Sequence, residues 1–85
     1  MARILVIEDE RDIRELFRRM LTEAGHIVDV APDGTAALKM VDSSPYDVLL
    51  LDIIMPKKDG IETMAALAKD HPTVKVIVIT GGGLH

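Results

Sequence analysis

Short apolar runs alternate along this chain with longer segments in which apolar residues recur every third or fourth position. The runs lie at residues 4–7, 26–31, 48–51 and 74–80. Their length and their content of Val, Ile and Leu predict β-strands. Asp29 interrupts the second run, which favours an exposed edge for that strand. Strands that alternate with helices predict an α/β fold with parallel strands and right-handed crossovers.

The longer segments predict helices with one apolar face. Between residues 9 and 26 the apolar stripe consists of Ile13, Leu16, Phe17, Met20 and Leu21, and Gly25 suits a left-handed helix end. The helix at 35–44 is predicted to turn Ala37, Leu38 and Val41 inward. The helix at 61–70 is predicted to turn inward Ile61, Met64, Ala65 and either Leu67 or Ala68.

Composition narrows the class of protein. The 85 residues allow a single domain over 1–85, in which 81–85 is expected to be a flexible tail. The absence of cysteine excludes disulfides and thiolate metal sites. A net charge of −4 gives no electrostatic reason to bind nucleic acid or an anionic membrane. The first apolar run is too short for a signal peptide and none would span a bilayer, so we expect a cytoplasmic protein.

Acidic residues end two of the predicted strands. Glu8 and Asp9 follow the first strand and Asp52 follows the third. Parallel strands end at one edge of a sheet, so these carboxylates converge if the two strands are neighbours. Two such charges about 4 Å apart repel by roughly 4 kcal/mol at an effective dielectric of about 20. A hard divalent cation, Mg²⁺, would offset that repulsion; the alternative is that the acids are only the polar ends of buried strands.

The segment "DIIMPKKDG" at 52–60 resembles the response-regulator receiver domain of two-component signalling. The family pattern is Asp-x-x-Met-Pro-x-x-Asp-Gly, and it is matched by Asp52, Met55, Pro56, Asp59 and Gly60. The acidic pair Glu8 and Asp9 and the strand-end Thr80 match as well. The resemblance covers residues 3–83.

The resemblance implies a signalling domain and not an enzyme. It implies that Asp52 accepts a phosphoryl group from a histidine kinase and that Thr80 acts as the switch residue. Asp9, Asp52 and the backbone carbonyl of Ile54 would bind Mg²⁺, with Glu8 holding a metal-bound water. The first helix would dock on the kinase; the alternative is a solvated face with the ion pairs Glu10–Arg14 and Glu15–Arg19.

The resemblance also implies a flavodoxin-like, three-layer fold with strand order 2-1-3-4. Receivers continue with a fourth helix, a fifth strand that ends in Lys, and a fifth helix, and this sequence stops after the fourth strand. We therefore expect an incomplete unit with doubtful phosphorylation. The strand at 74–80 and an open sheet face are expected to be uncovered, which predicts a symmetric homodimer through them.

Three functions compete at this point. The first is a phosphoacceptor domain that needs Mg²⁺ and a histidine kinase. The second is a non-signalling receiver fragment that self-associates through its fourth strand. The third is a phosphatase of the haloacid-dehalogenase type, which also uses a strand-end Asp. That family requires a second Asp two residues later, where this chain has Ile54.

Overall fold

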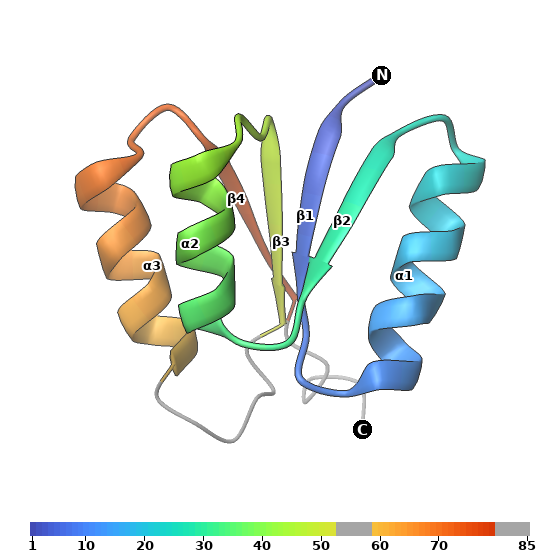
Figure 1. Ribbon diagram of the computed structural model, residues 1–85, viewed down its shortest axis with the longest axis horizontal. Helices are drawn as coiled ribbons and strands as arrows, with labels where there is room; N and C mark the ends of the chain where they lie inside the picture. The colour runs from blue at the N-terminus through green and yellow to red at the C-terminus, as the bar shows by residue number, and fades with distance from the viewer. Residues whose placement is uncertain (53–58, 80–85) are drawn as a thin grey trace.

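The computed structural model describes residues 1–52 and 59–79, and within the third helix it leaves the side chains of 59–61 and 64 undescribed. Strands and helices alternate strictly along the chain (Figure 1). The elements are β1 (Arg3–Ile7), α1 (Arg11–Glu23), β2 (Ile27–Ala31), α2 (Gly34–Ser43), β3 (Val48–Asp52), α3 (Asp59–Asp70) and β4 (Lys75–Ile79). The predicted elements are therefore confirmed, with boundaries that move by a few residues.

The four strands form one parallel sheet in the order β2-β1-β3-β4. In Figure 1 the helices α2 and α3 lie on one side of the sheet and α1 lies on the other, which gives three layers. This confirms the predicted strand order and the predicted edge position of the second strand. The carboxyl ends of all four strands consequently meet at one edge.

The main core lies between the sheet and the α2–α3 layer. Its strand residues Leu5, Ile7, Leu49 and Leu51 are fully buried, and Leu67 of α3 packs against them. Ala37 and Val41 of α2 are buried as predicted, and Leu38 is half-buried beside them. Burial of a Leu or Ile side chain contributes about 1.5–3 kcal/mol, so each of these buried residues stabilises the fold by about that amount.

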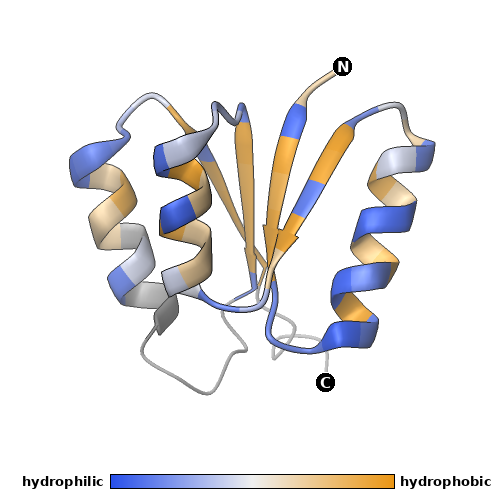
Figure 2. Cartoon of the chain, in the orientation of Figure 1, coloured by the Kyte–Doolittle hydropathy of each residue, from blue (hydrophilic) through white to orange (hydrophobic). Residues whose placement is uncertain are grey.

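The opposite face is covered only in part. Under α1 the β1 residue Val6 is 1% exposed, yet no residue of α1 itself is buried. Leu16 and Met20 of the predicted apolar stripe are 54% and 52% exposed. Figure 2 shows the apolar strands between α1, with its largely hydrophilic residues, and the two helices on the other side. The predicted apolar stripe thus exists, but two of its five residues are exposed to solvent.

Helix α3 differs from its predicted orientation. Thr63 and Leu67 are buried, whereas Ala65 and Ala68 are exposed, so the inward placement of Ala65 was wrong. Thr63 and Leu67 are four residues apart and share one helix face, while Ala65 lies two residues from each and points to the opposite side. The predicted inward residues Ile61 and Met64 lie outside the described side chains.

Two helix ends follow from local chemistry. Gly25 has a φ of +97°, and the N–H groups of Gly25 and His26 donate to the carbonyls of Thr22 and Leu21 at 3.0 and 3.1 Å. This is the Schellman arrangement that the glycine predicts. At the start of α2, Asp33 Oδ1 accepts a hydrogen bond of 2.8 Å from the N–H of Ala36, which makes Asp33 the N-cap.

Candidate functional site

The acidic site lies where β1 and β3 end. Ile7 pairs with Leu51 in the parallel ladder, so the next residues, Glu8 and Asp52, occupy matching positions on neighbouring strands. Glu8 is 2% exposed and Asp52 is 6% exposed. Asp9 follows them on the solvent side and is exposed. The structure thus brings Glu8 and Asp52 together, with Asp9 beside them at the surface.

Burial changes the protonation of Glu8. Desolvation raises the pKa of its carboxyl from 4.5 to about 8, with further contributions from the Asp52 carboxyl and, less, from Asp9. Glu8 Oε1 accepts a hydrogen bond of 3.1 Å from the N–H of Glu10. The buried Oε2 accepts none from the described donors. A proton on Glu8 turns it into a donor toward Asp52, which removes the repulsion between two buried carboxylates.

The loop that carries the acidic pair is held from its backbone. Nη1 of Arg14 donates to the carbonyl oxygens of Glu8 and Asp9 at 2.9 and 3.1 Å. The N–H of Glu8 donates to the carbonyl of Ala31 at 3.0 Å, which extends the β1–β2 pairing by one residue. Arg14, in the first turn of α1, therefore holds in place the backbone that carries Glu8 and Asp9.

The donor set suits a hard cation. Carboxylate oxygens are the ligands that Mg²⁺ prefers, and the unsatisfied Oε2 of Glu8 marks a buried oxygen without a donor. Across residues 1–52 and 59–79, however, no three His, Asp or Glu side chains are already grouped as a metal site. The predicted convergence is therefore seen for Glu8 and Asp52, while Asp9 lies next to Glu8 in the chain and is exposed.

Several residues predicted for the site lie outside the residues that the structure describes. Ile54 and Thr80 belong to the undescribed ranges, and so do the motif residues Met55 and Pro56. Helix α3 begins at Asp59, so the Asp-Gly end of the motif forms its first turn. Their predicted roles remain predictions.

The two ion pairs predicted on α1 are wrong. Arg14 was expected to pair with Glu10, but it binds the loop carbonyls of the acidic pair instead. Glu15 pairs with Arg18, three residues away, and not with Arg19. The i,i+4 spacing alone favours an ion pair between Glu10 and Arg14. The hydrogen bonds of Arg14 to the carbonyls of Glu8 and Asp9 depend on where this loop lies relative to α1, which the sequence does not give.

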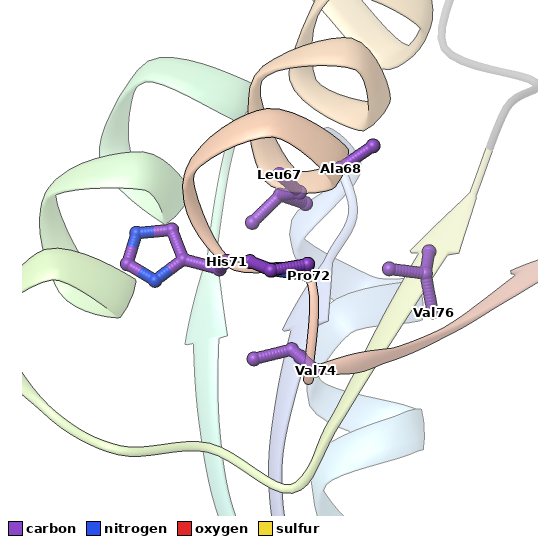
Figure 3. A pocket seen from close by; sticks show the side chains of 6 residues that line it. All are labelled: Leu67, Ala68, His71, Pro72, Val74 and Val76. Atoms are coloured by element: carbon purple, nitrogen blue, oxygen red, sulfur yellow. The ribbon is translucent and has the colours of Figure 1, made fainter.

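A second concavity lies away from the acids. It has a volume of about 300 Å³ and opens between the end of α3 and β4 (Figure 3). Its lining is mostly apolar and consists of Leu67, Ala68, His71, Pro72, Val74 and Val76. Nε2 of His71 lies 2.7 Å from Asp42 Oδ1, so the ring ties α3 to α2. We see no acid or nucleophile in this lining.

Comparison with known proteins decides the family. The sequence model of the response regulator receiver domain matches residues 4–84. The chain belongs to the response regulator receiver domain family. Among curated relatives, this receiver domain is 45% identical over 83 residues to the transcriptional regulatory protein CpxR of Escherichia coli K12. It is 42% identical over 82 residues to the transcriptional regulatory protein TcrA of Mycobacterium tuberculosis.

Solved structures agree with this assignment. The response regulator TrrA of Thermotoga maritima, solved with Mg²⁺-BeF, is 42% identical with a TM-score of 0.86, over 94% of this chain and 70% of that one. A receiver domain from Clostridium thermocellum has a TM-score of 0.87 at 32% identity, over 99% of this chain and 69% of that one. TrrA has also been solved with the histidine kinase ThkA. The flavodoxin-like receiver fold is thereby confirmed.

This chain covers only part of its curated relatives. The two alignments include 98% and 96% of this chain, but only 35% of CpxR and 32% of TcrA. Both curated relatives are named as transcriptional regulatory proteins, and neither name supports the alternative of a non-signalling fragment. In the part of the chain that the structure describes, no helix is long and apolar enough to cross a membrane.

Proposed function

We propose that this receiver domain accepts a phosphoryl group on Asp52 from a histidine kinase in the cytoplasm. The observation that supports this most directly is the position of Asp52, which is 6% exposed at the end of β3 beside Glu8. A carboxylate in that position is a nucleophile held by two strands. The similarity to TrrA, which has been solved with the histidine kinase ThkA, supports the phosphodonor class.

The transfer would proceed by exchange of one bond for another. A carboxylate oxygen of Asp52 forms a bond to phosphorus while the N–P bond of the kinase phosphohistidine breaks. The imidazole nitrogen keeps the electron pair of that bond and takes up a proton. Beyond Asp52 itself, the protein would take little part in the covalent chemistry. It would accelerate the transfer by positioning the reacting groups and by neutralising charge on the phosphoryl oxygens.

The neighbouring acids would hold the Mg²⁺ that such a transfer uses. Asp9, Asp52 and the backbone carbonyl of Ile54 are the proposed ligands, and Glu8 is proposed to bind a metal-coordinated water. When bound, Mg²⁺ neutralises charge on the phosphoryl oxygens. Glu8 must then give up its proton, so metal binding should be favoured at higher pH.

Two further roles complete the proposal. Thr80 would receive the new phosphoryl oxygen through its hydroxyl and so report phosphorylation. Helix α1 would contribute to the kinase contact, because it presents apolar Leu16 and Met20 next to exposed charges. An apolar patch with a charged rim is the usual composition of a docking surface.

Phosphorylation with a small phosphodonor tests the proposal. Incubation with acetyl phosphate and Mg²⁺ should add the mass of one phosphoryl group, and the adduct should be absent without Mg²⁺. Asp52→Asn should abolish it, whereas Asp70→Asn, an exposed residue at the end of α3, should leave it unchanged. A folded chain with no adduct, or an adduct that survives Asp52→Asn, contradicts the proposal and favours the non-signalling alternative.

A further inference from the structure

The acidic loop, residues 8–10, joins β1 to α1 and carries Glu8 and Asp9. The carbonyl groups of all its residues accept hydrogen bonds from a single residue of α1. Nη1 of Arg14 donates to the carbonyls of Glu8 and Asp9 at 2.9 and 3.1 Å. The backbone N–H of Arg14 donates to the carbonyl of Glu10 at 2.9 Å, which is the first hydrogen bond of α1. Arg14 therefore binds every carbonyl of the acidic loop.

The remaining hydrogen bonds of the acidic loop join it to β2 and to its own side chain. The N–H of Glu8 donates to the carbonyl of Ala31 at 3.0 Å. The N–H of Glu10 donates to Oε1 of Glu8 at 3.1 Å. The backbone of Glu8 is thus bonded to β2 through its N–H and to Arg14 through its carbonyl. A backbone bonded on both sides has little freedom to rotate, so these contacts set the direction of the loop side chains.

The start of α1 has no side-chain cap that could hold the loop in place of Arg14. Glu10 is the N-cap residue, and its backbone is extended, with φ −92° and ψ 122°. Among the residues that the structure describes, the Glu10 side chain finds no partner for a cap hydrogen bond. Asp, Asn, Ser or Thr at that position would accept one from the first turn of the helix. The connection between loop and helix consequently depends on Arg14.

Arginine is well suited to this task. Its guanidinium is always charged and carries N–H donors in a rigid planar fork, and one Nη can serve two acceptors. A hydrogen bond from a charged donor is stronger than one between neutral groups. Lysine can also donate to two carbonyls, but from a flexible stem, so it should replace Arg14 only in part.

We propose that Arg14 is a positioning residue for the Mg²⁺ site, an inference that rests on the proposed function of the domain. By binding the carbonyl of Asp9, it fixes the backbone from which the Asp9 carboxylate reaches the cation beside Asp52. Arg14 acts through that backbone and is given no contact with the phosphoryl group. Its effect should therefore appear in the affinity for Mg²⁺ and not in the chemical step.

The expected effect can be stated as a change in metal affinity. Groups that orient metal ligands from outside the coordination shell typically contribute about 10–100-fold to affinity. Arg14 binds the backbone of Asp9 and not its carboxylate, so we expect the low end of that range. Arg14→Ala should raise the Mg²⁺ concentration at half-saturation about tenfold. Saturating Mg²⁺ should return the maximum rate of Asp52 labelling by acetyl phosphate to near that of the parent.

Titration of the whole chain with Mg²⁺, followed by amide NMR without a phosphodonor, measures this affinity. Arg14→Met keeps an apolar stem without donors and should match Arg14→Ala, whereas Arg14→Lys should lie between them and the parent. Arg19→Ala removes the same charge from an exposed position of α1. Tyr46→Phe removes a hydrogen bond to Asp29 at the other end of the sheet. Both of these controls should keep the half-saturation of the parent.

A second measurement needs no metal. The amide hydrogen of Glu10 should exchange several times faster in Arg14→Ala and Arg14→Met than in Arg19→Ala, because the loop that supplies its acceptor is no longer held. Arg14→Met also serves as the test if Arg14→Ala does not fold.

The two proposals can fail separately. Equal half-saturation in the folded Arg14 and Arg19 variants overturns the positioning role even if Asp52 is labelled normally, and so does a parent whose amide signals do not respond to Mg²⁺. A loss of maximum rate that saturating Mg²⁺ does not recover also overturns it. A parent that binds Mg²⁺ but forms no adduct contradicts the proposed function, while a tenfold shift in Arg14→Ala still supports the positioning role.

Discussion

The hydroxyl of Tyr46 donates a hydrogen bond of 2.6 Å to Asp29 Oδ2, joining the start of β3 to the edge strand β2. The guanidinium of Arg3, on the strand between them, lies 3.7 Å from the same carboxylate oxygen and 5.1 Å from the centre of the Tyr46 ring. Burial and Asp29 together raise the pKa of Tyr46 to about 12. This polar group braces the amino end of the sheet, opposite the acidic site.

Tyr46→Phe should therefore destabilise the fold by about 1–2 kcal/mol, because it leaves the Asp29 carboxylate without its donor. Urea unfolding at neutral pH measures the change. Combining Tyr46→Phe with Asp29→Asn should cost less than the sum of the two single changes. Strict additivity would show that the contact contributes nothing to the folded state.

Glu8 makes stability depend on pH. Its folded pKa of about 8 lies above the ordinary 4.5, so between these values the folded chain holds a proton that the unfolded chain has lost. Stability should therefore fall as pH rises from about 4.5 to about 8 without Mg²⁺. Glu8→Gln should flatten that fall and be more stable than the parent by about 1–3 kcal/mol near pH 8.

The control for this change is Glu62→Gln, an exposed glutamate on α3. It should leave the pH profile of thermal unfolding as it is in the parent. Identical profiles for Glu8→Gln and the parent would mean that Glu8 is ionised in the folded chain at neutral pH. Added Mg²⁺ should stabilise the parent at pH 8, since the proposed ligands Asp9 and Asp52 would bind it only in the folded chain.

Arg14 should matter more than its neighbours on α1. Arg14→Ala removes two hydrogen bonds to the carbonyls of Glu8 and Asp9 and should destabilise by about 1–2 kcal/mol. It should also slow phosphorylation by acetyl phosphate, because Asp9 is then held less firmly. Arg19→Ala, at an exposed position, is the matched control. Equal effects of the two changes would argue against a special role for Arg14.

The N-cap of α2 gives a local test of stability. Asp33→Ala should destabilise by about 1 kcal/mol, since the N–H of Ala36 loses its acceptor. Asp33→Ser should recover most of that loss, because serine can accept the same hydrogen bond. Chemical denaturation of the three proteins measures both effects. A serine variant as unstable as the alanine variant would indicate that charge, and not capping, matters at this position.

The fold could be predicted from the sequence because each signal is local. Apolar runs specify the strands, the glycine at 25 specifies a helix end, and the alternation specifies parallel pairing. The meeting of Glu8 with Asp52 followed from the rule that parallel strands end at one edge. These inferences need only the order of residues and the periodicity of each element.

What the sequence could not supply depends on packing. Helical period alone gave the wrong side for Ala65, because the polar Thr63 is buried with Leu67. The pairing of Tyr46 with Asp29 spans 17 residues and has no sequence pattern. The contact of Arg14 with the loop depends on where α1 begins relative to β1. Each of these is settled by three-dimensional position.

The burial of β1 has a consequence for motion. Opening free energy rises with buried apolar contacts, and four of the five residues of β1 are buried, so its amide hydrogens should exchange through global unfolding. The edge strand β2 has one buried residue among five, and its amide hydrogens should exchange through local opening. Glu8 follows β1 directly, so the strand that opens last carries the first acid of the proposed site.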